Sequence, residues 1–360
     1  MRRCVVAAIL VLSAMFIITG ILPAQAADKL IKFPAGCQPE FETFFTWYAK
    51  DKGWDKEAGL DIEMKYFDSG MGMMEALPAK QWAVGGTSGT PATVGAARYG
   101  TKIITLADDE GLANVVMVRP DSPILKVKGH NPKCPEIYGS PETVKGKTVI
   151  ATTVSSSHFV LNAWLKALGL NDSDVVIKNM DQFQAVAAFE AGIGDIVSLW
   201  APHMYTGLEK GWKVVGNIRH SGSALPLVLV GEPEFLEKNP ETVAKFLQVF
   251  FRGIDMVKST PVDKLVPDYK RFMQDYCGLE MSDAMCKLDI ESHPVFSIDE
   301  QLKMFDNSNG PSVIEKWQMG VLDFFTSQGK LKKEDVAKVV DAKGVPNFVT
   351  DKYLKMAKKK

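Results

Sequence analysis

Residues 149–170 read VIATTVSSSHFVLNAWLKALGL, and this stretch decides the fold. Its β-branched start predicts a buried strand at residues 149–154. Apolar residues at helical spacing from Phe159 to Leu168 predict a helix that ends at Gly169. The serines in between favour a helix N-terminus, where free backbone N–H groups can bind an anion without an arginine. The stretch therefore predicts a ligand site rather than a catalytic one.

Units of strand, small polar loop and helix recur in the first part of the chain. Three such units occur before residue 110, with expected strands at residues 30–33, 61–67, 82–86 and 103–107. Repeated units of this kind predict an α/β fold with a mostly parallel sheet and helices on both faces. Ligands of such sheets lie beyond the carboxyl ends of the strands, and the expected site therefore lies among these loops.

The length of 360 residues favours two lobes, because single hydrophobic cores stop growing at about 250–300 residues. Residues 114–119 form an expected strand that leaves the first lobe, and residues 225–230 one that returns to it. From Pro233 onward the pattern is mainly helical. The sequence thus predicts a hinged clamshell with a first lobe of residues 27–119 and 225–360 and a second lobe of residues 120–224.

The overall composition is that of an ordinary soluble globular protein, 46% hydrophobic and 24% charged with a formal net charge of -1. Such a balance predicts no polybasic surface, so neither nucleic acid nor an anionic membrane is an expected partner. We expect the protein to be a monomer.

The first 26 residues have the pattern of a cleaved secretory signal peptide. Arg2 and Arg3 precede an apolar run at residues 5–22, and Ala24-Gln25-Ala26 matches the small-x-small cleavage rule. A retained membrane anchor is the alternative, which the helix breakers Gly20 and Pro23 disfavour. The mature chain is therefore expected in the periplasm.

Four cysteines follow the predicted signal, at positions 37, 134, 277 and 286. An even count in an oxidising compartment predicts two disulfides. We favour Cys277–Cys286, which closes a short loop, and Cys37–Cys134 then follows by elimination. Metal ligation is the weaker alternative, because the chain has no C-x-x-C motif and no paired histidine spacing.

Several short motifs resemble those of the taurine- and alkanesulfonate-binding proteins of ABC importers. In the first lobe these are FDSG at residues 67–70, GTSGTP at 86–91 and ADD at 107–109; in the second they are SSSHF at 155–159 and the segment 185–202. The resemblance covers roughly residues 30–250 and implies the type II periplasmic binding-protein clamshell, with mixed sheets and a helical C-terminal extension. The chain departs from the family pattern at Met71, at Gln182-Phe183 and in the length of the extension.

Candidate ligand-binding residues follow from the loops and from this resemblance. Ser156, Ser157 and His158 would capture an acidic headgroup, and Ser88, Gly89 and Thr90 form a second loop-to-helix start on the facing lobe. An aromatic face at the cleft edge can stack on a ligand or lie over a cation, carboxylates can hold an ammonium group, and methionine forms an adaptable wall. The residues proposed for these roles are Trp200, Glu40, Asp109 and Met71, and the candidate set also includes Gln182.

An enzymatic function is not expected, because the chain has no G-x-S-x-G elbow, phosphate loop, zinc helix or dinucleotide fingerprint. No cofactor or metal is predicted. The expected function is capture of a small organic anion or zwitterion by hinge closure, with delivery to an ABC permease. Taurine or another aliphatic sulfonate is the first choice of ligand, and a bulkier carboxylate, aromatic or amine-containing solute is the alternative.

Overall fold

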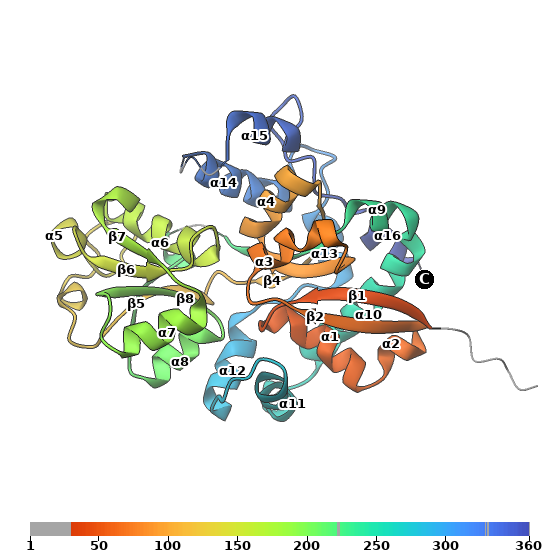
Figure 1. The fold of residues 1–360 in the computed structure, drawn as a ribbon, viewed down its shortest axis with the longest axis horizontal. Helices are drawn as coiled ribbons and strands as arrows, with labels where there is room; N and C mark the ends of the chain where they lie inside the picture. The colour runs from red at the N-terminus through yellow and green to blue at the C-terminus, as the bar shows by residue number, and fades with distance from the viewer. Residues whose placement is uncertain (1–29, 222–223, 328, 330, 360) are drawn as a thin grey trace, which may run out of the picture.

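The computed structural model describes residues 30–221, 224–327, 329 and 331–359, and its strands form two separate sheets (Figure 1). The predicted signal peptide lies outside the described residues. Among the described residues, no helix has both the length and the apolar character that crossing a bilayer requires.

The first sheet contains five strands in the order β2-β1-β3-β10-β4. Strand β1 runs parallel to β2 and β3, whereas β10 runs antiparallel to both of its neighbours. The sheet is therefore mixed, and its middle is closed by a strand from much later in the chain. Its members are β1 (Ile31–Cys37), β2 (Leu60–Tyr66), β3 (Val84–Ser88), β4 (Lys102–Asp109) and β10 (Pro226–Gly231).

The second sheet repeats this plan in the order β7-β6-β8-β5-β9. Strand β6 is parallel to β7 and β8, and β5 is antiparallel to β8 and β9. Residues 114–119, expected in the first lobe, thus form β5 of the second sheet, because each residue of β5 pairs with β8. Its members are β5 (Asn114–Val118), β6 (Thr148–Ala151), β7 (Val176–Asn179), β8 (Ile196–Trp200) and β9 (Lys213–Asn217).

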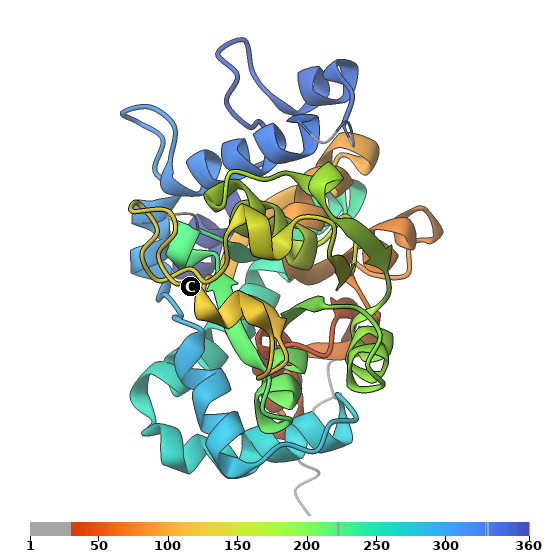
Figure 2. The same ribbon diagram turned by 90° about the vertical axis from the view of Figure 1, so that its left-hand side faces the viewer.

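Helices cover both sheets, and four of the helices that follow β10 flank the molecule at the top and bottom of Figures 1 and 2. Helices α14 and α15 lie at the top of both views, and α11 and α12 lie at the bottom. The helices up to β10 are α1 (Phe41–Asp51), α2 (Trp54–Glu57), α3 (Gly70–Glu75), α4 (Gly89–Tyr99), α5 (Pro141–Val144), α6 (Ser156–Ala167), α7 (Gln182–Glu190) and α8 (His203–Glu209). Those after it are α9 (Pro233–Lys238), α10 (Pro240–Ser259), α11 (Val262–Asp275), α12 (Asp283–Ser292), α13 (Ile298–Met304), α14 (Val313–Ser327), α15 (Lys333–Val339) and α16 (Lys352–Lys358).

Two hydrophobic clusters hold these layers together. The larger one lies mainly around the first sheet and includes Phe33 of β1 stacked on Phe246 of α10, with ring centroids 4.4 Å apart. The smaller one packs α6 against the second sheet through Leu161, Trp164 and Leu165. These three residues belong to the apolar stripe that the sequence predicts for this helix.

The four cysteines outside the predicted signal are free thiols, so the predicted disulfides Cys277–Cys286 and Cys37–Cys134 are wrong. Cys37 is buried in the first sheet, whereas Cys134 packs against the core of the second. Cys277 and Cys286 are each buried among apolar side chains of the larger cluster. Sequence spacing alone could not show that Cys37 and Cys134 lie against different hydrophobic clusters.

Candidate ligand-binding cleft

A small cavity of about 30 Å³ lies where the polar loops of the two sheets meet. Side chains from both sides line it, and most of them lie at the carboxyl end of a strand or within a few residues after it. The first-sheet side contributes Gln38, Glu40, Ser69, Gly70, Met71, Thr87, Ser88 and Pro91, and the second-sheet side contributes Thr152, Thr153, Val154, Ser155, Ser156 and Trp200. The cavity is therefore a cleft between the two halves of the molecule.

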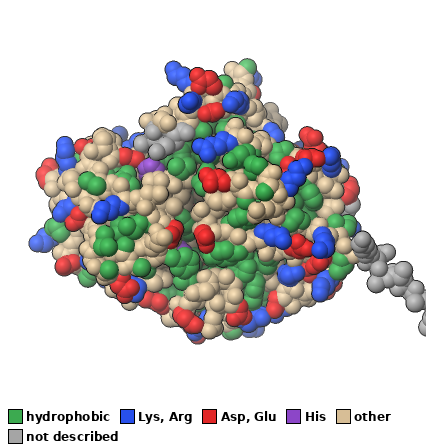
Figure 3. All heavy atoms as spheres, in the orientation of Figure 1, with side chains coloured by type: hydrophobic (Ala, Val, Ile, Leu, Met, Phe, Trp, Pro, Cys, Tyr) green, Lys and Arg blue, Asp and Glu red, His purple; other side chains and the backbone are tan. Residues whose placement is uncertain are grey.

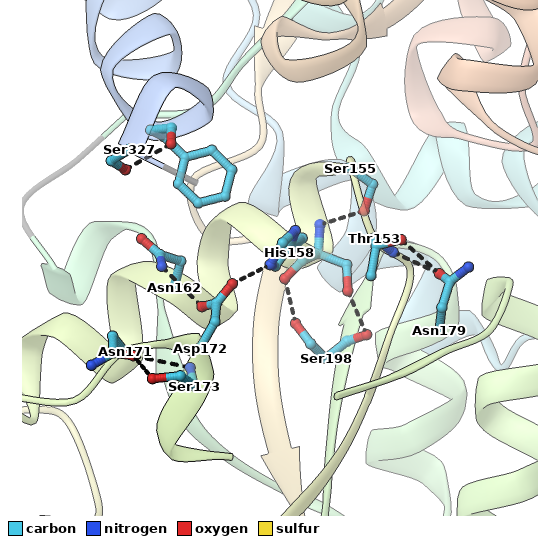
Figure 4. Close-up of polar contacts among 12 residues, drawn as sticks. Thr153, Ser155, His158, Asn162, Asn171, Asp172, Ser173, Asn179, Ser198 and Ser327 are labelled. Atoms are coloured by element: carbon cyan, nitrogen blue, oxygen red, sulfur yellow. Dashed lines mark hydrogen bonds and ion pairs between the residues drawn. The ribbon is translucent and has the colours of Figure 1, made fainter. Parts of the chain in front are cut away.

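The wall on the second-sheet side is the predicted strand–serine–helix turn. Ser155 caps α6, because its Oγ accepts a hydrogen bond from the Ser157 backbone N–H at 3.1 Å. The same hydroxyl donates to the Thr152 carbonyl oxygen at 2.6 Å (Figure 4 shows the Ser155 cap). Val154 has a φ of 59°, a left-handed conformation that a β-branched residue rarely adopts. The turn is thus held in a demanding shape that places the start of α6 at the cavity.

The facing wall contains two further helix starts. Ser69 caps α3 through a 3.2 Å hydrogen bond from the Gly72 backbone N–H, and α4 begins at Gly89. The Ser88 and Thr90 hydroxyls lie 3.0 Å apart, and Thr87 Oγ1 is buried without a hydrogen-bond partner among the described residues. This wall therefore presents hydroxyls and backbone N–H groups, which are neutral donors.

Glu40 is the one charged side chain among the described residues that line the cavity. Burial raises its pKa well above the usual value, and the charges of Glu42, Glu110 and Asp108 raise it further. The Trp200 side chain, which comes from the opposite wall, acts in the opposite sense on the pKa of Glu40. The cleft thus presents one carboxyl group to a solute, and three further acidic side chains lie near that carboxyl group.

The acidic side chains behind Glu40 are buried at the end of β4 and in α1. Burial raises the pKa of Asp108 to about 7, and burial together with the Asp108 charge raises the pKa of Glu110 to about 8. Neither Asp108 oxygen has a hydrogen-bond partner among the described residues. Burial alone would lower the pKa of His293, but its hydrogen bond and ion pair with Asp289 raise that pKa to about 10.

The structure brings five of the predicted ligand residues to the cavity wall: Glu40, Met71, Ser88, Ser156 and Trp200. Gly89, Thr90 and Ser157 are buried next to lining residues in the helix starts. The Ser157 hydroxyl donates to the Ser198 carbonyl oxygen at 2.8 Å and so fixes α6 to β8. Asp109, His158 and Gln182 are not among the lining residues.

Asp109 is committed to an ion pair between the two halves of the molecule. Its Oδ2 lies 2.6 Å from an Arg219 nitrogen, and its Oδ1 accepts from the Gly111 backbone N–H at 2.9 Å. Asp109 ends β4 of the first sheet, and Arg219 follows β9 of the second. Both carboxylate oxygens thus already have partners and are not held out for an ammonium group.

His158 points toward Asp172 in Figure 4. Its Nε2 lies 2.6 Å from Asp172 Oδ2, and Asn162 donates to the other oxygen of that carboxylate at 3.0 Å. The imidazole is buried, and it therefore fixes the first turn of α6 from behind the cavity wall.

Gln182 begins α7 and connects two lining residues. Its amide oxygen accepts from the Trp200 backbone N–H at 3.0 Å, and its Nε2 donates to Thr152 Oγ1 at 3.0 Å. Gln182 therefore positions the wall on which Thr152 and Trp200 lie.

Sequence reasoning missed nine lining residues, and the carboxyl-end rule could have found most of them. Gln38 directly follows β1, and residues 152–155 directly follow β6. Such positions gather at one edge of a sheet whatever the residue type. The nine are Gln38, Ser69, Gly70, Thr87, Pro91, Thr152, Thr153, Val154 and Ser155.

Comparison with known proteins identifies a family whose model matches this chain. The model of the family described as NMT1/THI5 like matches residues 40–264. The chain is 29% identical over 291 residues to a putative ABC transporter periplasmic binding protein of Brachyspira hyodysenteriae, covering 80% of each chain. It is 28% identical over 227 residues to the taurine-binding periplasmic protein of Escherichia coli, covering 62% of this chain and 64% of that protein.

Two solved structures share the architecture. The periplasmic aliphatic sulphonate binding protein SsuA of Escherichia coli superposes with a TM-score of 0.65 at 18% identity, covering 84% of this chain and 94% of SsuA. The periplasmic nitrate-binding protein NrtA of Synechocystis PCC 6803 gives 0.67 at 13% identity, covering 92% and 89%. These similarities confirm the predicted α/β clamshell fold with its C-terminal helices.

Proposed function

Because the chain belongs to the NMT1/THI5-like family, we propose that it is the periplasmic solute-binding component of an ABC importer. The relatives named above are binding proteins, and the site contains groups that hold a solute rather than transform one. The observation that carries the proposal is the cleft itself, since hydroxyls and helix starts from both sheets converge on one small cavity. A membrane permease is the partner that such a component requires.

The chemistry of the cleft favours a small zwitterion, with taurine or another aliphatic aminosulfonate as the ligand. The described lining residues include no arginine, lysine or histidine, so an acidic headgroup would be held by hydroxyls and by the N–H groups that begin α4 and α6. Glu40 would hold the ammonium end.

A bulkier amine-containing solute is the second candidate. Met71 and Trp200 give the cleft an apolar and aromatic side, and Glu40 would again hold the amine. Both candidates share a positively charged group at Glu40 and differ at the opposite end of the solute.

Hinge closure is the proposed mechanism. A first lobe that ends at residues 110–113 and resumes at residue 225 would move against a second lobe of residues 114–224, since β5 pairs within the second sheet. A solute that contacts both walls stabilises the closed arrangement in proportion to its preference for that arrangement.

A thermal-shift panel on residues 27–360 tests the proposal. A solute at about 100 times its dissociation constant stabilises the folded state by roughly 2.7 kcal/mol, which visibly raises the melting temperature. We expect a rise with taurine and none with nitrate. A rise with larger amines and not with taurine would keep the transport function and change the ligand. If no sulfonate, amino acid, amine or aromatic acid raised the melting temperature, the result would contradict the proposed function.

A further inference from the structure

Helix α14, in the C-terminal extension, is seated on the first lobe. Thr93 of α4 donates to the Gln318 side-chain oxygen at 2.8 Å, and both residues are fully buried. Phe325 and Ile314 of α14 belong to the larger hydrophobic cluster. Because Gln318 lies directly behind Gly89, α14 supports the helix start that faces the cleft from the first-lobe side.

The Phe324 side chain of the same helix reaches across to the second lobe. The Phe324 ring packs edge-to-face on Phe159, with centroids 5.1 Å apart, and on His158 at 5.5 Å. Both partners lie in the first turn of α6, which begins at the cavity wall. The Asp172 carboxylate holds the His158 ring in place, so Phe324 meets a fixed surface. Helix α14 therefore joins the two helix starts that face each other across the cleft.

This contact between α14 and α6 is narrow. Beside it lies an open groove of about 560 Å³ with Asn162 and Lys166 of α6 on one side and Gly320 and Asp323 of α14 on the other. Phe324 itself borders the groove yet is only 4% exposed. The contact is made by the buried Phe324 ring and lies next to an open groove. It can therefore form and break as a unit when the lobes move.

We propose that α14 is a latch that holds the second lobe against the first, with Phe324 as the positioning residue that acts on α6. The latch contact belongs to the closed arrangement, so it favours closure before any solute is bound. Its effect on affinity rests on the proposed function, whereas its effect on the shape of the ligand-free protein does not.

The first test measures small-angle X-ray scattering of the ligand-free protein. We expect Phe324→Ala to increase the radius of gyration, because the lobes separate when the ring is lost. Phe325→Ala is the matched control: its ring is equally buried in the same helix, and it should lower the melting temperature while leaving the radius unchanged. Phe324→Leu, which keeps apolar bulk, should give an intermediate radius.

A Phe324→Ala radius equal to that of the wild type would overturn the latch. The latch would also be overturned if the ligand-free wild type already had the larger radius of gyration of the variant. The same holds if Phe325→Ala increased the radius as much as Phe324→Ala. If Phe324→Ala does not fold, the comparison of Phe324→Leu with Phe325→Leu decides in the same way.

The second test uses taurine as the probe. Two edge-to-face ring pairs correspond to a loss of affinity of roughly 5- to 150-fold when the closed state becomes less populated by their full worth. We expect this loss for Phe324→Ala and not for Phe325→Ala. Taurine binding with equal affinity in both variants would overturn the latch and leave the transport function standing. A wild type that binds no solute would contradict the transport function, and the scattering data would still decide the latch.

Discussion

Glu40 is the residue on which the proposed ligand preference rests. Its carboxyl group is buried, it meets Trp200 from the opposite wall, and its pKa is raised by burial and by three neighbouring acids. A carboxyl in this setting gains most from a ligand that brings a positive charge. The sequence indicated Glu40 as an ammonium partner because it follows the first strand; Asp109 looked equivalent, but nothing in the sequence showed that Arg219 pairs with it.

The substitution Glu40→Gln tests whether the charge of this side chain, rather than its shape, contributes to solute affinity. The amide keeps the size of the side chain and removes the negative charge, so affinity for taurine should fall by roughly 10- to 100-fold. An alkanesulfonate without an amine should bind the variant at least as well as it binds the wild type. Calorimetric titration with both solutes measures the difference, and an equal loss for both would argue against an ammonium contact.

Buried acids also make stability depend on pH. In the native protein Asp108 and Glu110 have pKa values near 7 and 8, above those of the unfolded chain, so the native state holds protons that the unfolded state has released. The free energy of unfolding therefore falls as pH rises from about 4 to about 8. The raised pKa of His293 acts in the same direction at higher pH.

Urea unfolding at pH 5 and pH 8 should show a fall of more than about 1 kcal/mol in the wild type. Asp108→Asn should flatten this dependence, because one titrating group is lost and the pKa of Glu110 is no longer raised by it. Asp181→Asn, at an exposed position on the second lobe, serves as the control. An equally steep fall in Asp108→Asn would exclude Asp108 as a cause.

At the scale of single elements, the sequence predicted the parts of the cleft whose shape depends on neighbouring residues in the chain. The order of strand, serine turn and helix was predictable from the sequence, but the strand was expected to run to Val154 and instead ends at Ala151, with Thr152 to Val154 in the turn. Strand β1 was expected to stop at Phe33 and to be followed by a turn, yet pairing with β2 extends it to Cys37. The pairing of His158 with Asp172 could not be predicted either, because helical spacing places the imidazole in the first turn but does not identify its partner.

Helix α3 offers a test of how closely the elements of the first wall approach one another. A Cβ atom at Gly70 would collide with Thr87 Oγ1 and lie 2.8 Å from Pro91, whereas one at Gly72 would lie 3.4 Å from its nearest neighbour, Ser69 Oγ. Gly70→Ala should thus lower the free energy of unfolding by about 1–3 kcal/mol, as overpacking does.

Gly72→Ala is the matched substitution in the same helix, and it should be neutral or stabilise the protein by up to about 1 kcal/mol. Denaturant unfolding of both variants measures the contrast. If the two behave alike, α3 does not press on β3 and α4 as the structure shows.

At the scale of the whole molecule, two antiparallel strands define the halves. The clamshell could be predicted from length and from the repeated units, but the place of β5 could not, since its partners Leu199 and Asn217 are far away in the sequence. The Asp109–Arg219 pair spans the crossing between the sheets at 2.6 Å. It thus ties the ends of β4 and β9 at the hinge.

Arg219→Ala should weaken solute binding by no more than about fivefold, because the guanidinium is 45% exposed and water screens the pair. The difference from the wild type should shrink in 1 M salt. Arg98→Ala, which removes an exposed charge from α4, provides the comparison. Dissociation constants at low and high salt measure the effect, and a salt-independent loss would mean that Arg219 acts through packing instead.

Strand β10 also fixes the order in which a growing chain can complete its parts. Every strand of the second sheet lies between residues 114 and 217, before β10 is made. The first sheet needs β10 to join β3 to β4, so its final assembly waits for residues 226–231 although its other strands emerge first. A fragment cut short of Pro226 would leave β4 without its strand partner, and bare strand edges of this kind are templates for aggregation.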